Sequence, residues 1–316
     1  MTSAVRIRSF GGPEVLEVVE VPDPVAPEDG VVIDVRAAGV NPIDWKIREG
    51  RTASGPLTEP IGLGSDACGV VTSVGADPGR FAVGDAVIAR GLTGAYASRV
   101  AAPSTRLTSK PPSLSFEEGA ALGMPAGTAY QSLKSLGVRA GETLLVHAGS
   151  GAVGLAAVQF AHQWGLTVIA TASPAHHARL AELGAIPVAY GDGLLERLRA
   201  AAPGGIDVAL DIAGTDEALH TSLDLVADRS RIATLVAFQA AADLGIRLFS
   251  EHFGGGLGSE GRALRVEGVA VAADLAERGL FEIDIAAIYP LERVADAHRQ
   301  SQTGHVNGKI VLVPTP

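Results

Sequence analysis

Three glycines in the middle of the chain have the spacing of a dinucleotide-binding turn. Gly149, Gly151 and Gly154 form the pattern G-x-G-x-x-G, after an apolar run and before apolar residues at helical spacing. In a strand–turn–helix unit, the first glycine allows the tight turn and the second lets the backbone approach a pyrophosphate. The third lets the helix pack closely on the strand, with its N-terminus toward the phosphates. A plain turn is the alternative in a glycine-rich chain, but the flanking pattern predicts a cofactor site at Gly149, Ser150, Gly151, Ala152, Val153 and Gly154.

The segment after the second strand of this unit predicts which nucleotide binds. NAD sites place an Asp or Glu about 20 residues beyond the first glycine, where it binds the ribose 2′-OH. Here no acidic residue occurs between Glu142 and Glu182, and the expected place holds the run TASPAHHAR, residues 171–179. Its hydroxyls, histidines and arginine suit a 2′-phosphate. Ser173 and Pro174 are also typical of a capped helix start, and both interpretations can hold together. We therefore predict NADPH.

The first part of the chain is poor in the histidine and cysteine side chains that bind zinc in proteins. No histidine precedes His147, and Cys68 is the only cysteine, so no internal disulfide is possible. Catalytic zinc takes about three Cys, His or carboxylate ligands, and structural zinc about four. We expect no metal site, and we interpret Cys68 as a small buried hydrophobe. Without zinc to polarise an alcohol, reduction of an activated acceptor is a better prediction than alcohol oxidation.

A second group of chemically active side chains follows the apolar segment 30–40. Asn41, Asp44, Trp45, Lys46 and Arg48 lie within one short stretch. An Asn-Pro turn followed by a short amphipathic helix with a solvated lysine would explain the stretch without any catalytic role. The residues of this stretch fit both that structural role and a catalytic role.

The elements that must position these groups divide the chain. Up to about residue 122, short strands alternate with Gly- and Pro-rich turns, which is typical of a partly open barrel. From about residue 123, strands alternate with helices, which predicts a doubly wound parallel sheet of the Rossmann type. The expected strands are 4–8, 16–21, 30–40, 66–74, 85–90, 95–100, 143–147, 166–171, 186–190, 208–212, 231–236, 244–248 and 309–313. The expected helices are 152–163, 174–183, 193–201, 216–225, 259–278 and 291–300.

Several motifs, taken in order, resemble the medium-chain dehydrogenase/reductase superfamily over nearly the whole chain. Their order and spacing are similar to the zinc-free quinone oxidoreductase branch, which is zeta-crystallin-like. Zinc-dependent relatives carry Gly-His-Glu where this chain has Gly64-Ser65-Asp66. The motifs are FGGPEVL at 10–16, Asn41-Pro42-x-Asp44, Gly64-x-Asp66-x-x-Gly69, the segments 81–87, 94–97 and 128–130, the glycine turn, and GHVNGK at 304–309.

The resemblance implies three segments: a GroES-like substrate or catalytic domain at 1–122, a Rossmann NADPH-binding domain at 123–262, and a return to the first domain at 263–316. It implies that Ser173 and Tyr190 bind the 2′-phosphate, with His177 where relatives have a lysine. Thr128 would line the cofactor cleft. Lys309 would approach the cofactor phosphates, with a basic residue that merely enters an edge strand as the alternative. Together with the turn and Thr171, these complete the predicted cofactor site.

The resemblance also implies two catalytic residues. Asn41 would contact the nicotinamide end or a substrate oxygen. Lys46 stands where many relatives have a tyrosine, and it would stabilise a developing enolate or hydroquinone oxygen. The predicted reaction is zinc-independent hydride transfer from NADPH to a quinone or an α,β-unsaturated carbonyl. The alternatives are an enoyl-thioester reductase of the same fold, and a non-catalytic NADPH-binding sensor or crystallin-like protein.

Composition limits the partners. The net charge of −10 and the lack of a Lys/Arg run argue against binding to nucleic acid. No apolar run reaches the ~18 residues of a membrane helix, and the N-terminus lacks a signal-peptide core, so we expect a cytoplasmic protein. The resemblance also implies a homodimer, because members of that family usually dimerise through the edge strand of the nucleotide sheet, here the segment near 244–248.

Overall fold

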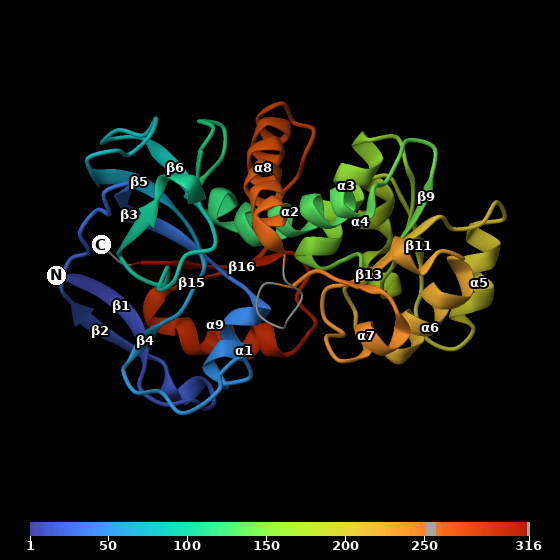
Figure 1. Ribbon diagram of the computed structural model, residues 1–316, viewed down its shortest axis with the longest axis horizontal. Helices are drawn as coiled ribbons and strands as arrows, with labels where there is room; N and C mark the ends of the chain where they lie inside the picture. The colour runs from blue at the N-terminus through green and yellow to red at the C-terminus, as the bar shows by residue number, and fades with distance from the viewer. Residues whose placement is uncertain (251–256, 315–316) are drawn as a thin grey trace. The chain divides into compact units, whose positions relative to one another are not determined.

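A computed structural model describes residues 1–250 and 257–314 of the chain (Figure 1). Contacts divide the chain into two compact units, which are Met1–Met124 with Val269–Pro316, and Pro125–Gly268. Two long helices contribute residues to both units: α2 (Phe116–Leu136) and α8 (Gly258–Glu277). The predicted combination of a β-rich unit and a parallel Rossmann-type sheet is confirmed.

The first unit is built on a long central strand, β3 (Gly30–Val40), which pairs antiparallel with three neighbours. Those neighbours are β5 (Asp66–Val74), β7 (Arg99–Pro103) and β16 (Lys309–Val313). The sheet continues through β6 (Ala86–Ala89), β8 (Leu107–Ser109) and β15 (Ile285–Pro290). A smaller sheet contains β1 (Thr2–Ile7), β2 (Glu17–Val21) and β4 (Ile61–Gly62). Helices α1 (Pro42–Arg48) and α9 (Val294–Gln302) complete the unit.

The strand expected at 95–100 is wrong in its bounds, since the regular strand begins at Arg99. The backbone before it bonds to several different partners instead of to one strand. Ala95 and Tyr96 donate to the carbonyls of Gly64 and Leu63 at 3.0 Å. Ala97 donates to the carbonyl of Ala95 at 2.9 Å, and Ser98 donates to that of Ser3 at 2.8 Å. The apolar residues of this segment alternate as in a strand, but no single neighbouring strand pairs with its whole length.

The second unit contains a six-stranded parallel sheet in the order β11-β10-β9-β12-β13-β14. Its strands are β9 (Thr143–His147), β10 (Thr167–Thr171), β11 (Ala185–Val188), β12 (Val208–Asp211), β13 (Ile232–Thr234) and β14 (Arg247–Leu248). Its shorter helices are α3 (Ala152–Gln163), α4 (His177–Glu182), α5 (Leu194–Ala201), α6 (Asp216–Leu225) and α7 (Ala240–Leu244). The sequence predicted the bounds of β9, α3 and α6 correctly.

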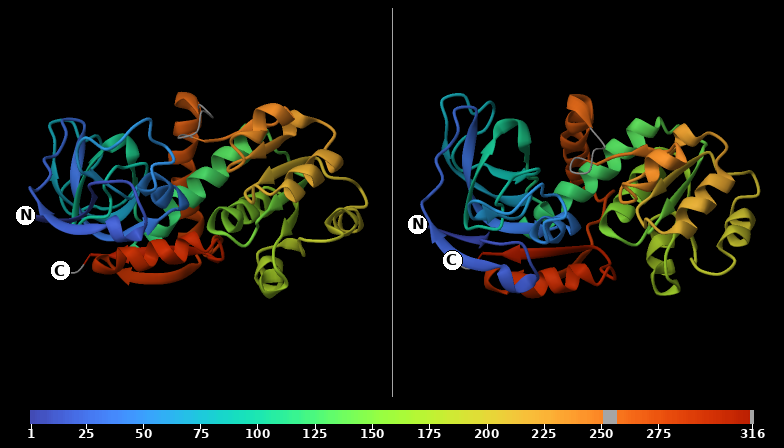
Figure 2. Two further views of the ribbon diagram at one scale, coloured as in Figure 1. Left: turned by 90° about the horizontal axis from the view of Figure 1, so that it is seen from below. Right: turned by 60° about the horizontal axis from the view of Figure 1, so that its bottom comes forward.

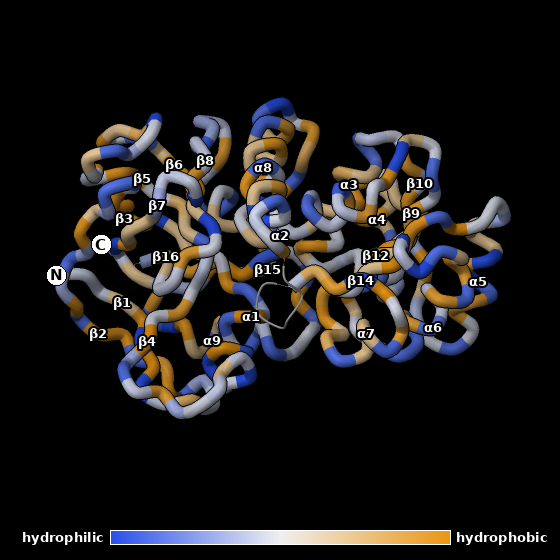
Figure 3. The backbone as a smooth tube through the Cα atoms, in the orientation of Figure 1, coloured by the Kyte–Doolittle hydropathy of each residue, from blue (hydrophilic) through white to orange (hydrophobic). Residues whose placement is uncertain are grey.

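Both faces of this sheet are covered, which explains why its central strands are apolar along their whole length. Leu145 and Ile169 lie in one buried cluster with residues of α5, α6 and α7. Their neighbours Leu144 and Val168 point to the opposite face and are also buried. Figure 2 shows the strands between these layers of helices, and Figure 3 shows the apolar colour of β9 and β10.

Candidate functional site

The turn between β9 and α3 has the close approaches that its glycines predict. A Cβ at Gly154 would lie 2.5 Å from the carbonyl oxygen of Ala148, and one at Gly149 would lie 2.7 Å from Cβ of Ala170. Beside Gly151 the nearest atom would be 3.7 Å away. The first and third glycines are therefore required by packing, whereas the second leaves room for a ligand.

The N-terminus of α3 faces this room. Gly151 is the N-cap of the 12-residue helix, and the first backbone N–H groups of a helix have no intrahelical partner. Ser150, Ala152 and Val153 are partly exposed around it. The helix dipole adds partial positive charge, so the turn offers N–H donors and an electropositive environment to a pyrophosphate.

Three of the predicted cofactor residues gather next to this turn. Strands β9, β10 and β11 are parallel neighbours, so their carboxyl ends lie at one edge of the sheet. Ser173 follows β10 and caps a 3-10 turn, but its hydroxyl makes no capping hydrogen bond. Tyr190 follows β11 and is 56% exposed. His177 begins α4, with its Nε2 3.2 Å from the carbonyl of Ala172.

Thr171 lies differently from Ser173, although the two are close in sequence. Thr171 is only 2% exposed, and its Oγ1 accepts the N–H of Ala148 at 3.2 Å. The same oxygen lies 3.3 Å from Nδ1 of His147. The hydroxyl of Thr171 therefore faces the glycine turn and not the solvent.

Thr128 presents an unsatisfied hydroxyl. It lies on α2 and is 7% exposed, and its Oγ1 is buried without a hydrogen-bond partner among the described residues. A buried polar atom without a partner is costly unless a ligand or water satisfies it. This is the kind of atom that the predicted role in the cofactor site requires.

Asn41 and Lys309 come together in the first unit, although 268 positions separate them. Pairing of β16 with β3 places Lys309 beside Asn41, and the lysine ammonium donates to Oδ1 of Asn41. It also lies 3.5 Å from Oδ2 of Asp66, which accepts Nδ2 of Asn41 at 3.0 Å. Nδ2 of Asn41 also lies 3.3 Å from Oγ of Ser65. Lys309, expected near cofactor phosphates, is 4% exposed and holds the amide of Asn41.

A second buried network continues from Asn41, and the sequence did not single it out as a site. Oδ2 of Asp44 accepts the backbone N–H of Asn41 at 2.7 Å and the hydroxyl of Tyr96 at 2.6 Å. Burial raises the pKa of Asp44 to about 7, although both hydrogen bonds lower it. The spacing Asn41-Pro42-x-Asp44 is typical of a helix cap, and it was the available signal.

The Tyr96 ring leads to a third buried polar pair. Tyr96 meets the ring of His298 edge-on, with centroids 5.8 Å apart. Nη1 of Arg48, a fully buried residue, lies 3.3 Å from Nδ1 of His298. Burial, followed by the neighbouring Arg48, lowers the pKa of His298 to about 3. A neutral ring is therefore maintained beside the buried arginine.

Lys46 lies on α1 and is half-buried. Its ammonium lies 5.5 Å from the centre of the Trp45 ring. Burial, and then repulsion from Arg51, lowers the pKa of Lys46 below that of an ordinary lysine. Its ammonium is therefore a better proton donor than that of a solvated lysine.

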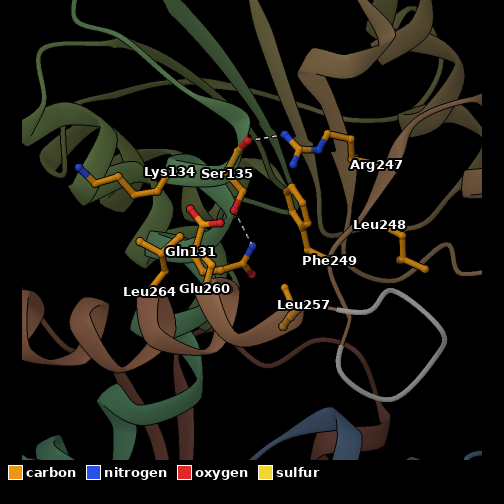
Figure 4. A pocket seen from close by; sticks show the side chains of 10 residues that line it. Gln131, Lys134, Ser135, Arg247, Leu248, Phe249, Leu257, Glu260 and Leu264 are labelled. Atoms are coloured by element: carbon orange, nitrogen blue, oxygen red, sulfur yellow. Dashed lines mark hydrogen bonds between the residues drawn. The ribbon is translucent and has the colours of Figure 1, made fainter.

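A cavity of about 530 Å³ lies within the second unit, among residues that the sequence did not predict as a site (Figure 4). Arg247 borders it, donates to the carbonyl of Ser135 and covers the ring of Phe249 at 4.8 Å. Lys134 borders it too, with its ammonium 4.6 Å from the centre of the Trp164 ring. Both cations are engaged by neighbours in this arrangement.

Among residues 1–250 and 257–314, no group of three or more His, Cys, Asp or Glu side chains could hold a metal ion. Cys68 is buried, as expected, and burial raises the pKa of its thiol to about 12. In the described part of the chain, no helix is long and apolar enough to cross a membrane.

The chain matches two protein-family models. "Alcohol dehydrogenase GroES-like domain" matches residues 27–112, and "Zinc-binding dehydrogenase" matches residues 183–312. The human protein named quinone oxidoreductase is 31% identical over 98% of this chain and 97% of its own length.

Two solved structures bear on the cofactor. A mycobacterial protein complexed with NADPH is 29% identical, with a TM-score of 0.83, over 99% of this chain and 100% of its own. A structure titled NAD-dependent alcohol dehydrogenase is 29% identical, with a TM-score of 0.84, over 99% of each chain.

The fold and the glycine turn define a medium-chain dehydrogenase/reductase, with a GroES-like unit and a Rossmann-type unit. Within that superfamily, the chain belongs to the quinone oxidoreductase family. The open side of Gly151, the helix N-terminus and the orphaned hydroxyl of Thr128 fit a nicotinamide dinucleotide.

Two glycine variants should separate packing from ligand binding in the turn. Gly154→Ala should lower the melting temperature because its methyl group would collide with backbone, at a typical cost of about 1–3 kcal/mol. Gly151→Ala should fold with a smaller loss but weaken the binding of a nicotinamide dinucleotide about tenfold, because its methyl group enters the ligand space. Thermal unfolding and calorimetric titration of both variants test this, and the opposite ranking would contradict it.

The buried carboxyl of Asp44 should make stability depend on pH. Because its folded pKa is raised to about 7, its contribution to the free energy of unfolding is complete below about pH 4 and is lost as the pH rises through 7. Asp44→Asn removes this titration. The melting temperature of the variant minus that of the wild type should therefore increase from pH 5 to pH 8. A gap that stays constant with pH would show that Asp44 does not titrate in this range.

Proposed function

We propose that this protein is an oxidoreductase that uses NADPH to reduce a quinone or an α,β-unsaturated carbonyl without zinc. The observation that carries the proposal is the edge formed by β9, β10 and β11. There the glycine turn, Ser173, His177 and Tyr190 gather, and no carboxylate occurs from residue 143 to residue 181. The NADPH complex of a relative and the name of the human relative support the cofactor and the acceptor.

The residues of the second unit would bind the nucleotide. The N–H groups at the start of α3 would hold the pyrophosphate beside Gly151. The hydroxyl of Ser173 and the ring of His177 would hold the 2′-phosphate, with Tyr190 beside the adenosine. The hydroxyl of Thr128 would gain the partner that it lacks. When bound, the nicotinamide supplies the hydride.

The residues of the first unit would position the acceptor. Lys309 and Asp66 hold the amide of Asn41 in one orientation. The amide oxygen keeps a second lone pair, so it can accept one more hydrogen bond while the lysine stays bound. The ammonium of Lys46 would stabilise negative charge that develops on the acceptor oxygen and would then donate a proton to it.

The cofactor preference is tested by following NADPH and NADH consumption with 9,10-phenanthrenequinone, benzoquinones and short enones. NADPH should be used at least about tenfold more efficiently than NADH, since no carboxylate of residues 143–181 repels the 2′-phosphate. Ser173→Asp should reduce that ratio by placing a carboxylate near the phosphate. Equal efficiencies with the two nucleotides would contradict the assignment. An enoyl thioester used in preference to every quinone would favour the thioester reductase, and no turnover at all would favour a binding protein.

The role of Lys46 predicts a distinct kinetic pattern. Lys46→Met should lower kcat with a quinone by about tenfold or more and leave NADPH binding unchanged, because the lost charge acts on the acceptor. Lys46→Arg should retain part of the activity. In the wild type, kcat should fall at alkaline pH below the usual lysine range, because the pKa of Lys46 is lowered. An unchanged kcat in Lys46→Met, with the same fall at alkaline pH as in the wild type, would show that Lys46 has no catalytic role.

A further inference from the structure

The turn at the candidate cofactor site contains a strained residue that is not a glycine. Ala148 has φ of 58°, and it is the only described non-glycine residue with positive φ. This left-handed conformation is unfavourable for an L-residue with a side chain and persists only where its surroundings hold it. It lies between β9 and Gly149, at the start of the turn.

The left-handed conformation of Ala148 has a geometric consequence for α3. The carbonyl of Ala148 accepts the N–H of Gly151, the N-cap of that helix, at 3.3 Å. The same oxygen would lie only 2.5 Å from a Cβ atom at Gly154, so it packs directly against the first turn of the helix. The peptide after Ala148 therefore sets the position of the first turn of α3, where the phosphate-binding N–H groups are.

Thr171 holds this conformation from the neighbouring strand by two bonds. Its Oγ1 accepts the N–H of Ala148 at 3.2 Å, and its backbone oxygen accepts the N–H of Gly149 at 2.9 Å. Nδ1 of His147 lies 3.3 Å from the same Oγ1, so the hydroxyl hydrogen bonds on both sides. All these atoms belong to the second unit. Thr171 and His147 are 2% and 1% exposed, so water does not compete for the bonds.

We propose that Thr171, oriented by His147, is a positioning residue that holds Ala148 in its left-handed conformation and so aligns the N–H groups of α3 for the pyrophosphate. The inference rests on the proposed binding of a nicotinamide dinucleotide. It gives Thr171 a role different from direct contact with the 2′-phosphate, because its hydroxyl is buried against the turn. NADPH and NADH share the pyrophosphate, so Thr171 should support the binding of both equally.

Calorimetric titration of Thr171→Val with NADPH and with NADH tests the proposal. Valine keeps the shape and removes the hydroxyl, so both dissociation constants should rise by a similar factor, about tenfold. Thr171→Ser retains the hydroxyl and should bind both nucleotides within about twofold of the wild type. A loss confined to NADPH would overturn the proposal in favour of direct phosphate contact. Unchanged binding, or equal losses in the valine and serine variants, would also overturn it.

A second substitution tests the link through Ala148. Glycine adopts positive φ without strain, so a glycine at position 148 should not need the hydroxyl of Thr171 to hold its conformation. In an Ala148→Gly background, Thr171→Val should weaken nucleotide binding by less than about threefold, and this coupling is read from a double-mutant cycle. A full tenfold loss in that background would overturn the proposal. Melting temperatures of all variants establish that the folded protein is titrated. Failure of the wild type to bind either nucleotide would instead defeat the proposed function.

Discussion

The buried ammonium of Lys309 is the constraint on which the first unit depends. A charge at 4% exposure is tolerated only if it is paired and fully hydrogen-bonded. Asp66 and the amide oxygen of Asn41 provide that environment. Asp66 begins β5, which pairs with β3, and Asn41 directly follows β3. The last strand of the chain must therefore pair with β3 in one register, since a shift of one residue would turn the lysine to the other face.

The same constraint extends to the polar residues around it. Asn41 ends β3 and begins α1, so holding its side chain also sets the start of that helix. Its backbone N–H binds Asp44, which binds Tyr96, whose ring meets His298. A buried polar group without a partner destabilises the fold, whereas a fully hydrogen-bonded network of such groups specifies one arrangement of the core, because each group needs its partner in place. The result is a rigid polar core beneath a helix that carries Lys46 on a half-buried position.

The second unit solves a different problem, which is to present backbone N–H groups to an anion. Its parallel strands bring three carboxyl ends to one edge, where open α/β sheets bind their ligands. Glycine alone does not account for the turn there. A strained alanine, clamped by Thr171, completes it. The dinucleotide pattern is therefore supported by a residue outside the pattern, on the next strand.

The sequence by itself determined the local features. Alternating or continuous apolar runs predicted β3, β5, β9 and β16, and the glycine spacing predicted α3, because these signals arise from neighbours along the chain. It also determined the acid-free stretch after residue 142, on which the proposed preference for NADPH rests. The pattern failed for 95–100, where alternation was present but the partners changed from residue to residue.

Only the tertiary structure decided which polar side chains meet. Lys309 was an isolated basic residue in the sequence, and strand pairing buries it on Asn41 across 268 positions. Thr171 and Ser173 read alike as hydroxyl donors, but Thr171 is the last residue of β10 and its hydroxyl bonds to the glycine turn, whereas Ser173 lies in the 3-10 turn that follows. Tyr96 and His298 were ordinary residues in the sequence and are joined in the fold. The physical reason is that burial and hydrogen-bond partners depend on long-range pairing, which no local pattern records.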